Sequence, residues 1–137
     1  MTTLIGTVLR MTVKDTIPPK IKRFIIVGES VDSLTLASVY INTELNIKVN
    51  YNLDLQCQHI ELKPNGRDYL DHTSFVDCSK LKIIDRCEIC EIIQNRPTVV
   101  IGKLNECDFE LVRRQIACST TIKGKIKKRY GFFESRF

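Results

Sequence analysis

Three cations stand at the start of an apolar segment, where one of them could bind a phosphate. Lys20, Lys22 and Arg23 precede residues 24–27, whose β-branched and aromatic side chains are typical of a strand covered on both faces. Prolines at positions 18 and 19 exclude a helix running into this strand. The strand would therefore present the guanidinium fork of Arg23 at a surface, as phosphate recognition requires. The alternative is that Lys22 and Arg23 only keep the strand end soluble.

Two histidines are candidate general acids or bases, because an imidazole titrates near neutral pH. They are His59 and His72, and Glu61 could orient His59 from the same face of a strand. The alternative is that each is a surface or half-buried histidine without a catalytic role.

Six cysteines raise the question of a metal site. Cys87 and Cys90 have the spacing of zinc ligands, and Cys57 with His59 could supply two more. Structural zinc usually takes its ligands from turns, whereas Cys87 and Cys90 lie in an apolar segment without glycine. We therefore predict buried thiols rather than disulfides, with no metal and no cofactor.

The net charge of +5 is concentrated at the end of the chain. Residues 123–137 hold six cations and one acid, and four aromatic residues are interleaved with them. Cations and planar rings together suit an unpaired RNA strand. The residues expected to contact RNA here are Lys125, Lys127, Lys128, Arg129 and Tyr130. Docking of the rings on a partner protein is an equal alternative, and a solvated tail is a third.

The remaining pattern predicts a mainly β, α+β domain built like a small barrel. We expect strands over residues 5–13, 20–28, 34–41, 57–62, 74–84, 87–93 and 98–102. Residues 87–93 also have helical spacing, and residues 47–51 fit a short strand or a loop. One helix is predicted from an N-cap at Asn105 to about Ser119, with Phe109, Val112 and Ile116 on its buried side. The barrel would cover residues 1–122, followed by a basic aromatic tail over residues 123–137.

The chain shows no sign of membrane insertion or export. No apolar run approaches the roughly 20 residues that span a bilayer, and the first residues lack the charged region and apolar core of a signal peptide. A cytoplasmic location is therefore expected, where cysteines stay reduced.

Four segments, taken in order, resemble the PemK/MazF family, the toxin ribonucleases of bacterial toxin–antitoxin pairs. Residues 6–9 are similar to the family's opening strand, and residues 23–27 stand where the family has Arg-Pro and an apolar strand. His-Ile-Glu-Leu at 59–62 and the segment 74–85 resemble two further strands, and Ile-Gly-Lys-Leu at 101–104 opens a segment like the family's ending. The resemblance implies a small SH3-like barrel with a C-terminal helix.

The same resemblance implies metal-independent cleavage of single-stranded RNA. Arg23 takes the place of the family's catalytic arginine, and the family's Thr/Ser falls at Thr43 or Asn42, of which Thr43 is the closer chemical match. Lys20, Lys22 and His59 are then expected to contact RNA. The family also implies a homodimer neutralised by a small acidic antitoxin.

Two departures from the family pattern leave other functions open. Phe24 replaces the proline that usually follows the catalytic arginine, and residues 16–20 replace the family's first loop. One alternative is a non-catalytic module of the same fold that holds RNA or a protein. Another is an inhibitor of a protein target such as gyrase.

Overall fold

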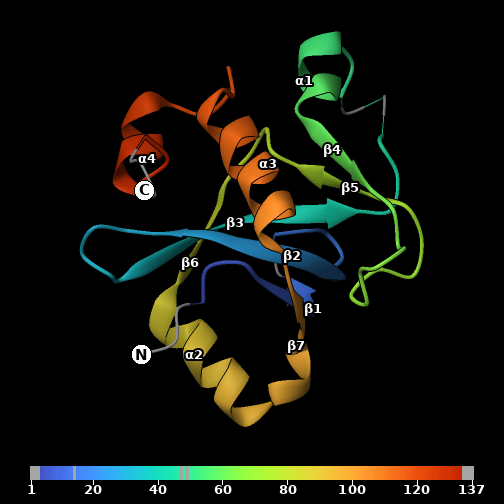
Figure 1. The fold of residues 1–137 in the computed structure, drawn as a ribbon. Helices are drawn as coiled ribbons and strands as arrows, with labels where there is room; N and C mark the ends of the chain where they lie inside the picture. The colour runs from blue at the N-terminus through green and yellow to red at the C-terminus, as the bar shows by residue number, and fades with distance from the viewer. Residues whose placement is uncertain (1–3, 14, 47, 49, 134–137) are drawn as a thin grey trace.

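The fold is a curled antiparallel sheet, shaped like half a barrel, with helices on both faces (Figure 1). A computed structural model describes residues 4–13, 15–46, 48 and 50–133. In chain order the elements are β1 (Thr7–Val13), β2 (Lys20–Glu29), β3 (Thr35–Asn42), α1 (Leu53–Cys57), β4 (His59–Leu62), β5 (Ser74–Asp77), β6 (Lys82–Asp85), α2 (Arg86–Asn95), η1 (Pro97–Val99), β7 (Val100–Lys103), α3 (Glu106–Ala117) and α4 (Gly124–Arg129). The predicted mainly β, α+β class is confirmed.

The centre of the sheet is the hairpin of β2 and β3. The strands follow the order β4-β5-β3-β2-β1-β7, and β6 pairs with the part of β3 that β5 leaves open. Arg23 lies opposite Arg10 of β1 and Ile41 of β3. The register therefore places Arg23 at the end of the sheet where β2 begins and β3 ends.

Two apolar cores lie on opposite faces of this sheet because successive strand residues alternate between them. Ile25 and Val39 face the larger core, which α3 covers with Phe109, Val112 and Ile116. The other face is closed by α2 and by η1. Its buried residues are Leu9, Phe24, Ile26, Leu36, Ile89 and Val99.

The helix predicted after Asn105 is confirmed as α3. The Asn105 side chain accepts a hydrogen bond from the Asp108 amide, 2.8 Å away, and so caps the first turn. The three residues predicted to be buried at helical spacing are all in the core. None of the helices in the described residues is both long and apolar enough to cross a membrane.

The strand predicted over residues 87–93 is wrong, because this segment belongs to α2. The Asp85 side chain caps the helix by accepting from the Glu88 amide at 3.0 Å. Ile89 is buried, and Ile92 and Ile93 pack beside it against the sheet. The helical spacing of these residues therefore outweighs their two-residue alternation.

Three other segments also differ from the prediction. The strand expected over residues 74–84 is divided into β5 and β6, and residues 53–57 form the short helix α1. No helix is predicted in the tail, whereas residues 124–129 form α4. The short strand or loop expected at 47–51 includes residues 47 and 49, which lie outside the described part of the chain.

Candidate functional site

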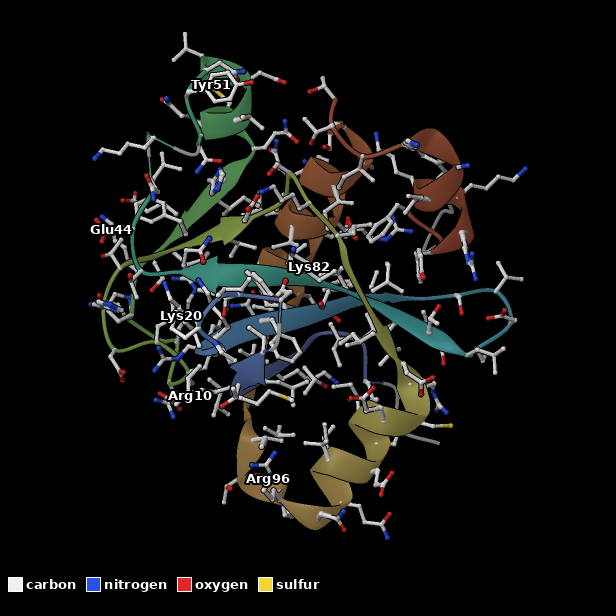
Figure 2. All side chains as sticks on the ribbon, turned by 180° about the vertical axis from the view of Figure 1, so that it is seen from behind. Arg10, Lys20, Glu44, Tyr51, Lys82 and Arg96 are labelled. Carbon is white, nitrogen blue, oxygen red and sulfur yellow. The ribbon has the colours of Figure 1, made fainter. Side chains whose placement is uncertain are left out.

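A groove of about 700 Å³ lies at the end of the sheet where β2 begins and β3 ends. Figure 2 shows Arg10, Lys20 and Glu44 around this end of the molecule, with Lys82 nearer the middle of the sheet. The charged residues that line the groove are Arg10, Lys20, Lys22, Arg23, Lys80 and Lys82, against Asp15, Glu44 and Asp77. Cations therefore outnumber acids two to one, and the field of the groove favours an anionic ligand.

Five of the predicted site residues line this groove together. They are Lys20, Lys22, Arg23, Asn42 and Thr43. Their joint placement follows from the hairpin register, which brings the start of β2 beside the end of β3.

The register divides these residues between two faces. Lys22 and Asn42 share one face, where Lys22 Nζ donates to Asn42 Oδ1 at 3.1 Å. Arg23 and its cross-strand neighbour Ile41 face the opposite side. Thr43 comes two residues after Ile41, in the bend that follows β3, so alternation favours Thr43 over Asn42 as the companion of Arg23.

The guanidinium group of Arg23 is paired with a carboxylate from a distant loop. Its Nη2 lies 2.8 Å from Asp71 Oδ2, and the two side chains are 22% and 81% exposed. Arg23 Nε is buried and has no hydrogen-bond partner in the described structure. The ion pair uses one nitrogen of the guanidinium group. The Asp71 carboxylate is exposed to solvent, so another anion can displace it from Arg23.

The loop that carries Asp71 is anchored by two residues that precede it. Arg67 donates from Nε and Nη2 to the two oxygens of the buried Asp108, at 2.7 and 2.9 Å. Tyr69 packs so closely on Gly102 that a Cβ there would lie 2.9 Å from the Tyr69 ring. Hydrogen bonding to Asp108 further raises the pKa of Arg67, which stays charged. These contacts fix the position of the loop, which keeps Asp71 beside Arg23.

Tyr40 forms part of the groove wall between two ammonium groups. Lys22 Nζ and Lys82 Nζ lie 5.8 and 5.4 Å from the centre of its ring. The Tyr40 hydroxyl donates to Asp15 Oδ1 at 2.7 Å, and Lys82 is 3.0 Å from the other oxygen. The Tyr40 hydrogen bond and the Lys82 charge lower the pKa of Asp15, and burial together with that carboxylate raises the pKa of Tyr40.

His59 does not reach the groove, contrary to the prediction that it contacts RNA. Its side chain is 2% exposed, its Nδ1 is 2.8 Å from the Leu55 carbonyl oxygen, and its Nε2 is 3.5 Å from Asp77 Oδ1. The imidazole is held between α1 and β5 and has no surface left for a ligand. His72, by contrast, is exposed and follows Asp71 directly.

The tail residues lie at the other end of the molecule, where α4 packs on the larger core (Figure 1). Lys125, Lys128 and Arg129 are exposed, as an RNA contact would require. Lys127 and Tyr130 are buried, so the prediction that they contact RNA is wrong.

The buried tail residues have structural partners instead. Lys127 Nζ donates to the carbonyl oxygens of Ala117 and Ser119 at the end of α3, and the Tyr130 hydroxyl is 2.9 Å from Thr35 Oγ1. The position of Lys127 is favourable because a positive charge stabilises the C-terminus of a helix. The position of Tyr130 is favourable because its ring is buried in the core.

The cysteines are all free thiols, but the prediction that they are buried holds only for Cys78. Burial raises the pKa of the Cys78 thiol. Cys57, Cys87, Cys107 and Cys118 are exposed. The described residues contain no group of three or more His, Cys, Asp or Glu side chains placed to hold a metal ion.

Sequence reasoning missed Asp71 and Tyr40. Asp71 lies in a polar connection 48 positions from Arg23, and no local pattern links the two. The sequence indicates Tyr40 only weakly. It lies on the same strand face as the candidate Asn42, but its neighbour on β2, Phe24, is apolar and does not indicate a binding site.

No protein-family model matches this chain, and no curated protein matches it.

Proposed function

We propose that this protein is an endoribonuclease of the PemK/MazF type that cleaves single-stranded RNA in the groove at the end of β2 and β3. The observation that supports the proposal most is the placement of Arg23 and Thr43 in one groove with an excess of cations. The order of the motifs and the curled sheet fit the SH3-like barrel of that family.

The proposed reaction needs charge stabilisation more than it needs a metal. The ribose 2′-hydroxyl gives its proton to solvent water while its oxygen attacks the adjacent phosphorus, and the O2′–P bond forms. The P–O5′ bond breaks and the 5′-oxygen takes up a proton from solvent, which leaves a 2′,3′-cyclic phosphate and a 5′-hydroxyl end. Arg23 stays protonated and would neutralise the extra negative charge on the phosphoryl oxygens, while the Thr43 hydroxyl would donate a hydrogen bond. Lys20 and Lys22 would hold neighbouring phosphates.

A second candidate is RNA binding without cleavage, and the Arg23–Asp71 ion pair favours it. The carboxylate occupies the corner of the fork that a phosphate would take. If this pair persists when RNA is bound, Arg23 cannot stabilise the transition state, and the groove holds RNA only through its other cations.

The proposed partners follow from the charge of the groove. An acidic antitoxin segment would meet the same cations as RNA and would exclude it by competition. The homodimer implied by the resemblance is part of this proposal.

The experiment is a cleavage assay on a mixed-sequence RNA in excess chelator, with Arg23→Ala and Thr43→Ala variants. We expect the wild-type protein to cleave and Arg23→Ala to lose about 100-fold or more in rate, since an oriented charged donor is removed. Arg96→Ala is the matched control, because Arg96 is an exposed arginine at the end of α2, away from the groove (Figure 2). Binding without cleavage would support the second candidate, and absence of both would reject the two together.

A further inference from the structure

Tyr40 is held as a rigid aromatic surface at the groove. Its ring packs against the core beneath α2 and lies 6.4 Å from the Phe24 ring at an interplanar angle of 56°. The hydroxyl is fixed by Asp15 at 2.7 Å. A ring fixed at both its body and its polar tip loses little conformational freedom when a ligand stacks on it.

The cations beside the ring are also fixed in place. Lys22 is held by Asn42 at 3.1 Å, and Lys82 is held by Asp15 at 3.0 Å. Both ammonium groups lie within 6 Å of the ring centre. Both charges therefore lie over the Tyr40 ring, close to where the backbone of a nucleotide stacked there would run.

We infer that Tyr40 is a stacking site for one unpaired nucleobase, with the flanking phosphates bound by Lys22 and Lys82. This inference rests on the proposed RNA function and names the nucleotide subsite within the same groove. Stacking on a ring is tolerant of base identity, so the site would add affinity for single strands rather than select a sequence.

The phenol suits this role because it stays neutral. Burial and the Asp15 carboxylate raise the pKa of Tyr40, so no phenolate repels the phosphates at physiological pH. The ligand is a single strand because the bases of a duplex are stacked on one another and have no free face to offer the ring.

The test compares a short, labelled oligouridylate with an abasic oligomer of the same length and charge, by fluorescence anisotropy at one fixed salt concentration. We expect the wild-type protein to bind the oligouridylate roughly tenfold more tightly than the abasic strand. Tyr40→Leu should weaken binding of the oligouridylate more than binding of the abasic strand and so remove this preference. Tyr40→Phe should keep most of the preference.

Lys80→Gln is the matched control, because Lys80 lines the groove but is not one of the two lysines that lie over the ring. It should weaken binding of both oligomers by the same factor. Equal wild-type affinity for the two oligomers would overturn the inference even if Tyr40→Leu failed to fold. If the wild-type protein bound neither oligomer, the proposed RNA function would fail as well, whereas RNA binding without base preference would reject the stacking site alone.

Discussion

Arg23 and Asp71, 48 positions apart in the chain, form an ion pair at the end of the sheet, with Nη2 2.8 Å from Oδ2. The carboxylate is well exposed, so the pair adds little to stability. Its effect is on the groove, because Asp71 brings a negative charge to the arginine that the proposed reaction needs most.

Replacing Asp71 should therefore strengthen RNA binding. In Asp71→Asn the guanidinium fork is released, and affinity for a short RNA should rise between about 1.5-fold and fivefold, the range expected for an exposed ion pair. Anisotropy titration at low salt measures the change, and the free energy of unfolding should move by less than about 1 kcal/mol. Weaker binding in this variant would show that Asp71 assists the ligand.

The anchor of the same loop should be far more important for stability. Asp108→Asn breaks a bidentate pair whose carboxylate is buried and leaves Arg67 without its anion. We expect a loss of about 3 kcal/mol in the free energy of unfolding, measured by urea denaturation. Asp68→Asn is the control, because Asp68 is an exposed acid in the same loop. Similar midpoints for both variants would contradict this role.

Gly102 should not tolerate a methyl group. An added Cβ would lie 2.9 Å from Cδ1 and 3.1 Å from Cβ of Tyr69, so the ring would have to shift. Gly102→Ala should lower the free energy of unfolding by about 1–3 kcal/mol. Gly124→Ala, with open space around the added Cβ, should be neutral or slightly stabilising in the same denaturation experiment.

Lys127 should act through stability rather than through RNA. Lys127→Met keeps the apolar stem but leaves the carbonyl oxygens of Ala117 and Ser119 without their donor, at a cost of about 1–3 kcal/mol. Lys128→Met, one position away and exposed, should leave the melting temperature unchanged. RNA affinity of a folded Lys127→Met protein should match that of the wild type. A specific loss of affinity would return Lys127 to the binding surface.

Asp15 should contribute to the acid sensitivity of the fold. Folding lowers the pKa of Asp15, so the carboxylate favours the folded state above its unfolded pKa of about 3.9. That contribution is lost as the pH falls below this value through the folded pKa. Asp15→Asn should therefore show a smaller loss of stability between pH 5 and pH 2, to be measured by denaturation midpoints across the range. An unchanged slope would mean that the Tyr40 hydrogen bond has no energetic role.

The sequence alone determined the two central strands, α3 and the surface position of Arg23. Runs of β-branched residues bounded by prolines and turn residues define β2 and β3 locally, and an N-cap at Asn105 followed by apolar residues at helical spacing defines α3. These signals lie within a few residues of the elements that they predict. The pairing of these two strands then brings the cation cluster beside Thr43.

Only the tertiary structure decided which residues each side chain contacts. Residues 86–95 fit both the period of a helix and the two-residue period of a strand. The helix is favoured because its apolar side packs on the sheet face that carries Phe24 and Ile26. The Arg23–Asp71 pair, the burial of Tyr130 and the position of Tyr40 between two lysines depend on segments far apart in the chain. A local sequence pattern indicates which backbone conformation a segment prefers. The residues that the segment contacts depend on how distant parts of the chain pack against it.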